Sequence, residues 1–239
     1  MSAEHSLAMT GIFLEIPART SSEKAYRLIR EDIITGALEP GLKLKIDMLR
    51  ERYDLGTGPL REALARLSSD HLVHLTGQRG CVVAAMSVED ALDIGNMRKM
   101  LEMQAVESSI ENASDEWELG LIATFHRLEQ IERRMDQGIH EMAEWEIRNQ
   151  KFHDALVGAC NSKWLLRMRQ TMFSQHARYR CLSRVTSVKT RDISLEHRAI
   201  FEAAMDRNSQ LAKKEIGKHI QRTSDTVVSA LMANLSPTN

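Results

Sequence analysis

The side chains best suited to chemistry in this sequence are three imidazoles and one amide in its second half. Asn149 and His153 are four residues apart in the segment NQKFH, so they share one face of a predicted helix. His197 and His219 belong to later helical segments. Three imidazoles and a carbonyl oxygen can form the first coordination shell of Zn²⁺ or a related divalent ion. On spacing alone, ordinary core or surface histidines are the commoner explanation, because ligands on separate helices leave no local signature.

A second segment with chemical potential is DLGTGPLREALARL, in which two glycines and a proline precede a helical run. Gly56 and Gly58 leave backbone amides uncovered by side chains, and Thr57 can cap the helix that follows. Pro59 is tolerated because the first turn of a helix has no intrahelical acceptor for the N–H that proline lacks. The segment therefore predicts a helix whose N-terminus can bind phosphate.

The helix that begins at this Gly-Thr-Gly-Pro turn (residues 56–59, called the elbow below) combines an apolar stripe with two arginines. Leu60, Leu64 and Leu67 recur at helical spacing and are expected to face inward. Arg61 and Arg66 lie off that stripe, where they can contact DNA bases or phosphates. This helix is the candidate for reading a nucleic acid.

Two further helices are predicted before the elbow. Thr20 and Glu23 fit a capping box that opens a helix through residues 23–35, and Gly36 is suited to end it. A shorter helix fits residues 45–54, after a turn at the segment EPG.

A hairpin is predicted after the elbow helix. Strands fit near residues 72–76 and 81–84, with Arg79 at the GQRG tip between them. Three helices followed by such a hairpin describe a winged helix-turn-helix, in which the last helix enters the major groove. A small helical subdomain with an ordinary solvated hairpin has the same local pattern, so spacing leaves both readings open.

The distribution of proline separates a second, all-helical region from the first. No proline occurs between Pro59 and Pro237, and long amphipathic runs begin at Ser87. Six helices are predicted, over residues 88–110, 115–135, 140–159, 162–184, 192–207 and 209–235. The expected fold is mainly α, with a tail (1–19), a winged helix-turn-helix domain (20–86) and a helical bundle of six or seven helices (87–236).

Composition narrows the class of protein without identifying a partner. Residues 18–87 hold 11 Lys and Arg against 9 Asp and Glu, a mild positive balance that permits DNA binding by a local patch. No segment approaches the roughly 20 apolar residues of a membrane span, and the N-terminus lacks a secretory pattern, so no membrane partner is expected. The three widely spaced cysteines argue against a disulfide framework and for a reducing, cytoplasmic setting.

The stretch from Ala25 to Val83 resembles the DNA-binding domain of the GntR family of bacterial transcription regulators, including the spacing from GALEPG to PLREAL to the RG of the wing. This resemblance implies double-stranded operator DNA as a partner. The implied DNA-binding residues are Lys43, Thr57, Gly58, Arg61, Arg66, Arg79 and Gly80. The family usually has Ser-Arg-Thr or a similar triplet before the proline. This chain has Gly-Thr-Gly instead, so an arginine that typically contacts DNA is absent at Thr57.

The segments RNQKFHDALVGACNSKWLL, EHRAIFEAAMDRN and KKEIGKHI resemble the ligand-binding domain of the FadR subgroup of that family. In metal-binding members of the subgroup, an Asp or Asn and three histidines hold the ion, and these positions fall on Asn149, His153, His197 and His219. Zn²⁺ is the expected metal, with Ni²⁺ and Mn²⁺ as the other candidates. Aspartate is the commoner first ligand, and the neutral Asn149 leaves the site more positive, which should weaken metal retention and favour an anionic effector.

The same resemblance implies a small organic acid as effector. Arg98, in NMRKMLE, matches an arginine that commonly faces the pocket and can bind a carboxylate bidentately. A surface salt bridge with Glu102 is the alternative for this arginine. The segments DEWE and MRQTMFSQHARYR are similar to those of carbon-starvation, glutarate-responsive repressors, which suggests a small dicarboxylate or a related acid.

Together these observations predict a cytoplasmic, ligand-responsive bacterial transcription repressor rather than an enzyme. One winged module covers one half-site, so a homodimer on a palindromic operator is expected. A metal-dependent enzyme that uses the three histidines, with Glu146 as a base, is the first alternative. A structural helical scaffold with a vestigial DNA-binding head is the second.

Overall fold

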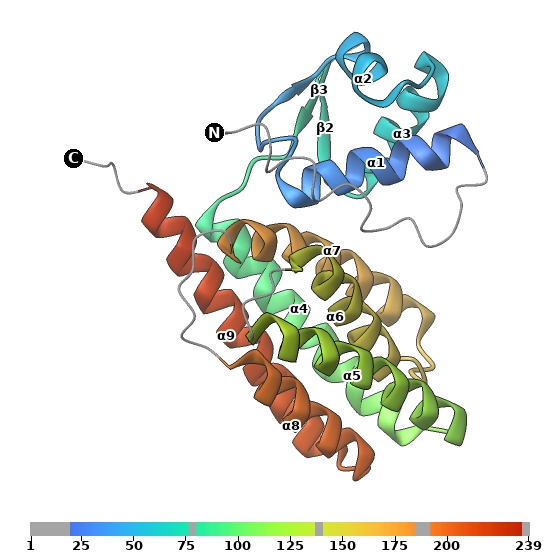
Figure 1. Ribbon diagram of the computed structural model, residues 1–239, viewed down its shortest axis with the longest axis vertical. Coiled ribbons are helices and arrows are strands. Elements are labelled where there is room, and N and C mark those ends of the chain that lie inside the picture. Colours follow the sequence, from blue (N-terminus) through green and yellow to red (C-terminus); the bar gives the residue numbers. More distant parts are fainter. Residues whose placement is uncertain (1–19, 77–79, 137–140, 185–191, 236–239) are drawn as a thin grey trace. The chain divides into compact units, whose positions relative to one another are not determined.

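The computed structural model of the protein describes residues 20–76, 80–136, 141–184 and 192–235 (Figure 1). The predicted tail over residues 1–19 lies outside this part of the chain. The chain divides into two compact units, one of residues 1–87 with 177–185 and the other of residues 88–176 with 186–239. Each unit has its own apolar core. In the described residues the first unit consists of three helices, three short strands and the end of helix α7 (Lys163–Arg184), and the second is all helical, so the predicted mainly α fold is confirmed.

The first helix of the first unit begins and ends where its sequence signals predict. Helix α1 (Ser21–Thr35) is capped by Thr20, whose side chain accepts a hydrogen bond of 3.1 Å from the backbone N–H of Glu23. It ends at Gly36, which has a φ of 83°, a left-handed conformation that glycine adopts without strain. Ala25, Ile29 and Ile33 point from this helix into the core.

Helices α2 (Ile46–Tyr53) and α3 (Thr57–Ser69) follow, joined by the elbow. The predicted inward stripe of α3 is confirmed, because Leu60, Leu64 and Leu67 are all buried. The prediction that Thr57 caps the helix is wrong. Gly56 occupies the N-cap position without a side-chain bond, and Thr57 is the first helical residue.

A small antiparallel sheet completes the first unit. Strand β1 (Lys43–Leu44) pairs with β3 (Gly80–Val83), which also pairs with β2 (Val73–Thr76), so the order is β1-β3-β2. Thr76 lies opposite Gly80, and the hairpin tip of residues 77–79 lies outside the described part of the chain. The predicted hairpin strands are present, whereas β1 was not predicted.

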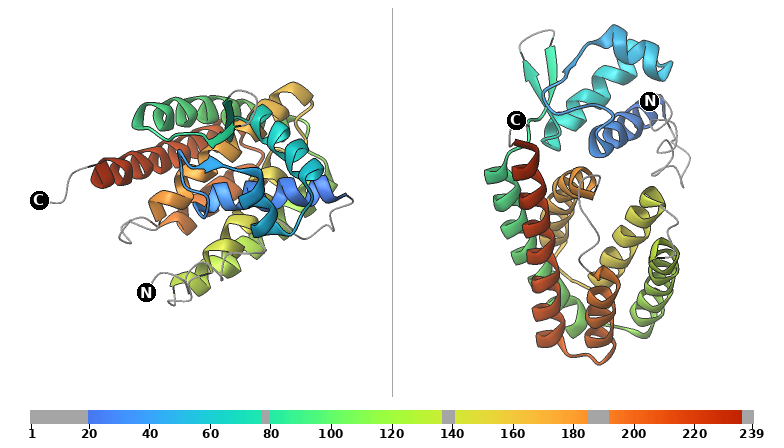
Figure 2. Two further views of the ribbon diagram at one scale, coloured as in Figure 1. Left: turned by 90° about the horizontal axis from the view of Figure 1, so that it is seen from above. Right: turned by 60° about the vertical axis from the view of Figure 1, so that its left-hand side comes forward.

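The second unit is a bundle whose helices match the six predicted runs. They are α4 (Val88–Glu111), α5 (Asp115–Asp136), α6 (Met142–Leu156), α7 (Lys163–Arg184), α8 (Ile193–Met205) and α9 (Ser209–Leu235). The right-hand view of Figure 2 shows α4 and α9 running side by side. At Gly95 the two helices approach so closely that a Cβ atom would collide with the hydroxyl of Ser224. No helix in the described residues is long and apolar enough to cross a membrane.

Candidate functional site

The three histidines singled out in the sequence meet inside the bundle. His153 comes from α6, His197 from α8 and His219 from α9, and all three are buried. The ring centroid of His153 lies 5.6 Å from that of His197 and 5.3 Å from that of His219, and the last two centroids are 4.8 Å apart. One ring nitrogen of each lies within 4.8 Å of the others, an arrangement that can hold a metal ion.

Two of these imidazoles are oriented by carboxylates that the sequence analysis did not identify. Nδ1 of His197 lies 2.7 Å from Oε1 of Glu132, and Nδ1 of His219 lies 2.9 Å from Oε2 of Glu196. When Nδ1 donates its hydrogen to a carboxylate, the lone pair of the neutral ring is on Nε2. Nε2 of His197 is buried and has no hydrogen-bond partner among the described residues. Both carboxylates therefore favour the tautomer that a metal requires.

His153 has a different environment. Its side chain is fully buried, and neither ring nitrogen has a hydrogen-bond partner among the described residues. Burial first, and then the charges of His219, Arg98, His197 and Arg169, hold the pKa of His153 well below its usual range. The ring is consequently neutral at physiological pH, which is the form that binds a metal.

Asn149 lies one helical turn before His153 on α6 and is 2% exposed. Its Oδ1 atom is buried without a hydrogen-bond partner in the described part of the chain. A buried amide oxygen without a partner costs free energy unless a ligand satisfies it. Three imidazoles and this oxygen form a donor set that fits Zn²⁺.

Arg98 is buried in the bundle, so a surface salt bridge with Glu102 is the wrong description of it. The arginine is 1% exposed and Glu102 is fully buried, and Nε of Arg98 lies 3.5 Å from Oε1 of Glu102. Nη1 of Arg98 also lies 2.7 Å from Nδ1 of His176 on α7. The charge is thus held inside the bundle, where it contributes to the lowered pKa of His153.

A second buried arginine, Arg169, was missed by the sequence analysis. It is 2% exposed, its Nε lies 3.1 Å from Oε1 of Glu102, and it also pairs with Asp154. The Cζ atoms of Arg98 and Arg169 lie 4.5 and 4.9 Å from the ring centroid of Phe173. Two guanidinium groups therefore share one fully buried carboxylate. No local signal identifies Arg169, because its two carboxylate partners lie on other helices, Glu102 on α4 and Asp154 on α6.

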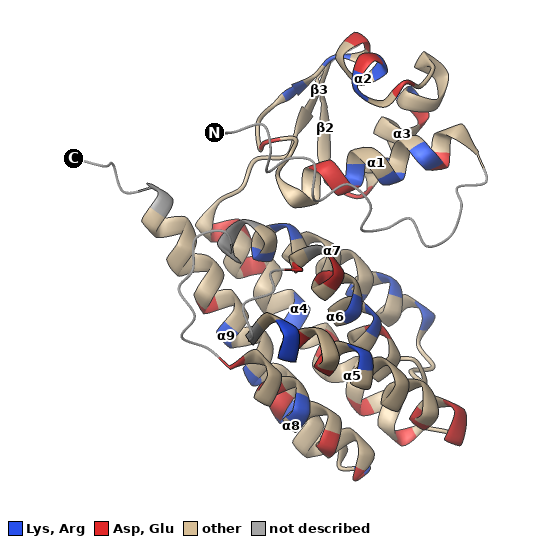
Figure 3. Ribbon diagram, in the orientation of Figure 1, with Lys and Arg blue, Asp and Glu red and all other residues tan. Residues whose placement is uncertain are grey.

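In the first unit, the candidate DNA-binding residues come from β1, from the wing and from both ends of α3. Lys43, Gly58, Arg61 and Arg66 are exposed, and Thr57 and Gly80 are partly exposed. Arg79 lies outside the described residues. Figure 3 shows acidic residues interspersed among the basic ones on α1 and α2, so charge alone does not define a binding face.

Polar contacts anchor helix α3 to the rest of the first unit, the DNA-binding head. The guanidinium of Arg66 stacks on Tyr26, with Cζ 3.8 Å from the ring centroid. The hydroxyl of Tyr26 donates a hydrogen bond of 2.6 Å to Asp70, the residue that follows α3. No hydrogen bond or ion pair of Arg61 is found within the described residues, so its side chain is available to a ligand.

Comparisons with known proteins agree with this architecture. Residues 21–83 match the family described as bacterial regulatory proteins, gntR family, and residues 93–222 match the FCD domain. The HTH-type transcriptional repressor GlaR of Escherichia coli is 35% identical over 218 residues, which cover 90% of this chain and 99% of the relative. The HTH-type transcriptional regulator BphR of Paraburkholderia xenovorans is 34% identical over 210 residues, covering 87% of this chain and 86% of the relative.

The fold is also similar to that of a solved structure, McbR/YncC of E. coli. That structure has a TM-score of 0.74 and 18% sequence identity, and the match covers 91% of this chain and 99% of the other. At this identity the likeness concerns the fold alone.

Proposed function

The chain belongs to the gntR family of bacterial regulatory proteins and carries an FCD domain, and from this premise we propose that it is a repressor released from its operator by a small carboxylic acid. The relatives reported above are transcriptional regulators, so a metal-dependent enzyme is not supported. Because a DNA-binding regulator acts where the chromosome is, the cytoplasm is the expected location.

The proposed operator is a palindrome bound by a homodimer. One head presents one α3 helix, which matches one half-site, and a single module of this size rarely supplies specific operator affinity alone. Arg61 is the residue expected to read a base, with Lys43, Arg66 and Arg79 as contacts to the backbone or to the groove beside it.

The proposed effector site lies at the histidine cluster of the FCD domain. The observation that carries it is the meeting of three buried imidazoles beside two buried guanidinium groups. His153, His197, His219 and Asn149 would hold Zn²⁺, with Ni²⁺ and Mn²⁺ as the other candidates. A bound metal would supply a Lewis-acidic position for one carboxylate oxygen of the effector. Arg98 would orient the anion through paired N–H donors.

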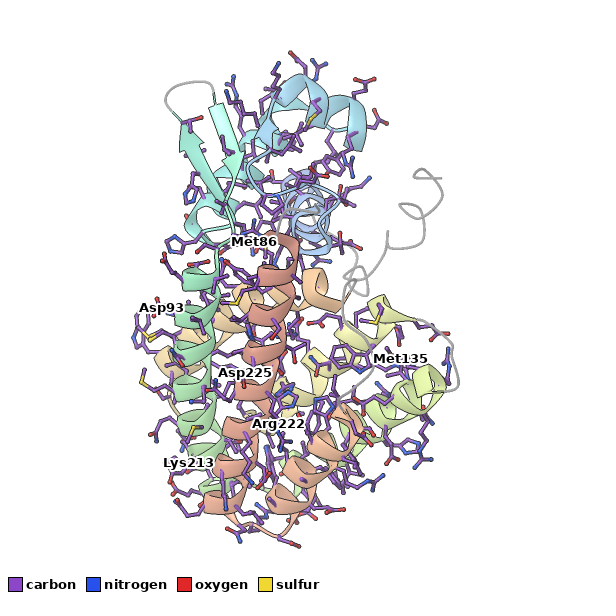
Figure 4. All side chains as sticks on the ribbon, turned by 90° about the vertical axis from the view of Figure 1, so that its left-hand side faces the viewer. Met86, Asp93, Met135, Lys213, Arg222 and Asp225 are labelled. Carbon is purple, nitrogen blue, oxygen red and sulfur yellow. The ribbon has the colours of Figure 1, made fainter. Side chains whose placement is uncertain are left out.

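Effector binding must favour one arrangement of the protein to change its affinity for DNA. The connecting segment between β3 and α4, which includes the labelled Met86 in Figure 4, joins the DNA-binding head to α4, the helix that carries Arg98. A change in the bundle that alters the spacing of two heads in a dimer would weaken operator binding. The coupling free energy equals the difference in effector affinity between the two arrangements.

The test combines metal analysis with operator binding. Protein purified without chelator or a nickel column should contain about one divalent ion per chain, by the donor set above. A screen of small carboxylic acids by thermal shift should find one that raises the melting temperature, and this acid should then release operator DNA in a mobility-shift assay.

The matched variants are His197→Ala and His126→Ala, the latter on the exposed side of α5. His197→Ala should lose metal and effector response but retain operator binding, whereas His126→Ala should behave as wild type. Metal-free wild-type protein, together with a full effector response in His197→Ala, would contradict the proposed site. Failure to bind the DNA upstream of its own gene would instead favour the structural scaffold.

A further inference from the structure

We propose that Glu132 and Glu196 are positioning residues that supply the negative charge of the metal site, which its ligands lack. This inference rests on the metal site of the proposed function. The four proposed ligands are three neutral imidazoles and one neutral amide, so a divalent ion would bring two uncompensated positive charges into the bundle. Burying charge without compensation is strongly unfavourable.

Glu132 supplies the first compensating charge. It lies on α5 and is 6% exposed, with Oε1 2.7 Å from Nδ1 of His197. The same oxygen accepts a hydrogen bond of 3.2 Å from the indole N–H of Trp145, which lies on α6 and is 3% exposed. The indole fixes the carboxylate, and the carboxylate fixes the imidazole. The negative charge is therefore one ring away from the position of the metal.

Glu196 supplies the second charge. It precedes His197 on α8, yet it serves the other histidine, with Oε2 2.9 Å from Nδ1 of His219. Its Oε1 accepts a hydrogen bond of 3.1 Å from Arg222, which is labelled in Figure 4 and lies on α9 with His219. Helix α8 thus contributes one ligand and the carboxylate behind another.

The two carboxylates make the site asymmetric. Glu132 and Glu196 lie behind His197 and His219, whereas neither nitrogen of His153 has a hydrogen-bond partner among the described residues. The charges of Arg98 and Arg169 act on His153, and these two arginines share Glu102. An anionic ligand is consequently favoured on the His153 side and repelled on the opposite side.

Asn149 explains why the outer carboxylates matter in this chain. A ligand Asp at this position would provide a negative charge in direct contact with the metal, and Asn149 does not. A carboxylate behind an imidazole raises the basicity of the ring, and losing such a partner typically weakens metal affinity about 10- to 100-fold. Restoring charge at position 149 should therefore compensate for charge lost at position 132.

The central experiment measures Zn²⁺ affinity by competition with a chromophoric chelator. Glu132→Gln keeps a hydrogen-bond acceptor for His197 and removes the charge, so Zn²⁺ should bind about 10- to 100-fold more weakly. The double variant Glu132→Gln with Asn149→Asp should recover most of that loss. The melting temperature of the metal-free protein should change little, and the visible absorption of Co²⁺ bound to Glu132→Gln should differ from that of wild type.

Glu129→Gln is the matched control. Glu129 lies three residues earlier on α5, is 15% exposed and pairs with Arg133 and Arg198 rather than with a histidine. This variant should bind Zn²⁺ with wild-type affinity. If Glu132→Gln does not fold, Trp145→Phe and Glu196→Gln replace it, because each disturbs one of the same two carboxylates.

The outcomes separate this inference from the proposed function. Absence of Zn²⁺ binding by the wild-type protein would overturn the metal site itself. Wild-type binding that stays within twofold in Glu132→Gln, or in both replacement variants, would overturn the role of the carboxylates and leave the metal site intact. Loss of affinity that Asn149→Asp does not rescue would overturn the claim that Glu132 acts by compensating the charge of the metal.

Discussion

The buried charge cluster of the bundle predicts an unusually large effect for a nearly isosteric substitution. Glu102→Gln removes one negative charge and leaves the size of the side chain unchanged, so no cavity forms. Glu102 is fully buried, and its Oε1 lies 3.5 Å from Nε of Arg98 and 3.1 Å from Nε of Arg169. Removing this carboxylate leaves two guanidinium groups, 1% and 2% exposed, without the anion they share.

The expected loss of stability follows from burial rather than from distance. Removing one partner of a buried ion pair typically costs about 3–5 kcal/mol, because the remaining charge is neither solvated nor paired. Asp154 stays near Arg169, so we expect a loss of about 3 kcal/mol, near the lower end of that range. All three tryptophans lie in the helical unit, so their fluorescence in urea reports its unfolding.

Glu107→Gln on the same helix is the control for Glu102→Gln. Oε2 of Glu107 lies 2.5 Å from Nζ of Lys213, which is closer than either contact of Glu102, but the two side chains are 16% and 29% exposed, so solvent reaches the pair. Solvent screens such a pair, so the urea midpoint should hardly change. Equal shifts in the two variants, or a negligible shift in Glu102→Gln, would refute the argument that burial decides the energy. A further expectation is that acetate stabilises Glu102→Gln more than wild type, because an external carboxylate can replace the lost one.

Three further predictions concern the head and the metal site. Arg61→Ala should weaken operator binding by about 1–3 kcal/mol and leave the fold intact. Mobility-shift assays would measure the affinity, with the exposed Lys24→Ala as control, and unchanged affinity would show that Arg61 does not contact DNA. Asn149→Asp should tighten Zn²⁺ by adding an anionic ligand, and chelator competition that shows no gain would exclude residue 149 from the first shell. Burial raises the pKa of the Cys81 thiol to about 11. The shift therefore contributes fully to the free energy of unfolding below the pKa of the thiol in the unfolded chain, about 8.5, and this contribution is lost as the pH rises through 11. Alkylation of Cys81 by iodoacetamide at pH 8 should accordingly be slow in the native protein and fast in urea.

Local signals allowed most of the fold to be predicted from the sequence. The cap at Thr20, the stop at Gly36 and the inward leucines of α3 depend on residues within one or two turns. The six bundle helices follow from amphipathic spacing in a region free of proline. Strand β1 could not be found in this way, because its two residues are extended only through pairing with β3, which lies almost 40 residues later.

The candidate site was harder to predict from the sequence, because its residues come from separate helices. The resemblance pointed to His153, His197 and His219, and the structure brings their side chains together, although their role as ligands remains a proposal. Glu132 and Arg169 carried no signal, since a charged residue on an amphipathic helix is usually solvated. Their burial depends on how α5 and α7 pack in the bundle, which periodicity does not specify.

The buried polar atoms of the bundle connect its stability with its regulation. Oδ1 of Asn149, both ring nitrogens of His153 and Nη2 of Arg169 have no hydrogen-bond partner among the described residues, and each such atom costs about 1–3 kcal/mol. A metal and an anion that supply these partners stabilise the arrangement in which the atoms converge. A ligand shifts an equilibrium only by the difference in its affinity for the two arrangements of the protein. The free energy that the unpaired atoms cost in the unliganded bundle is recovered when the ligand binds, and it can therefore drive a change in operator affinity. Apolar residues of similar size in place of Asn149 and His153, neither of which is in an ion pair within the described part of the chain, should therefore give a more stable protein that no longer responds.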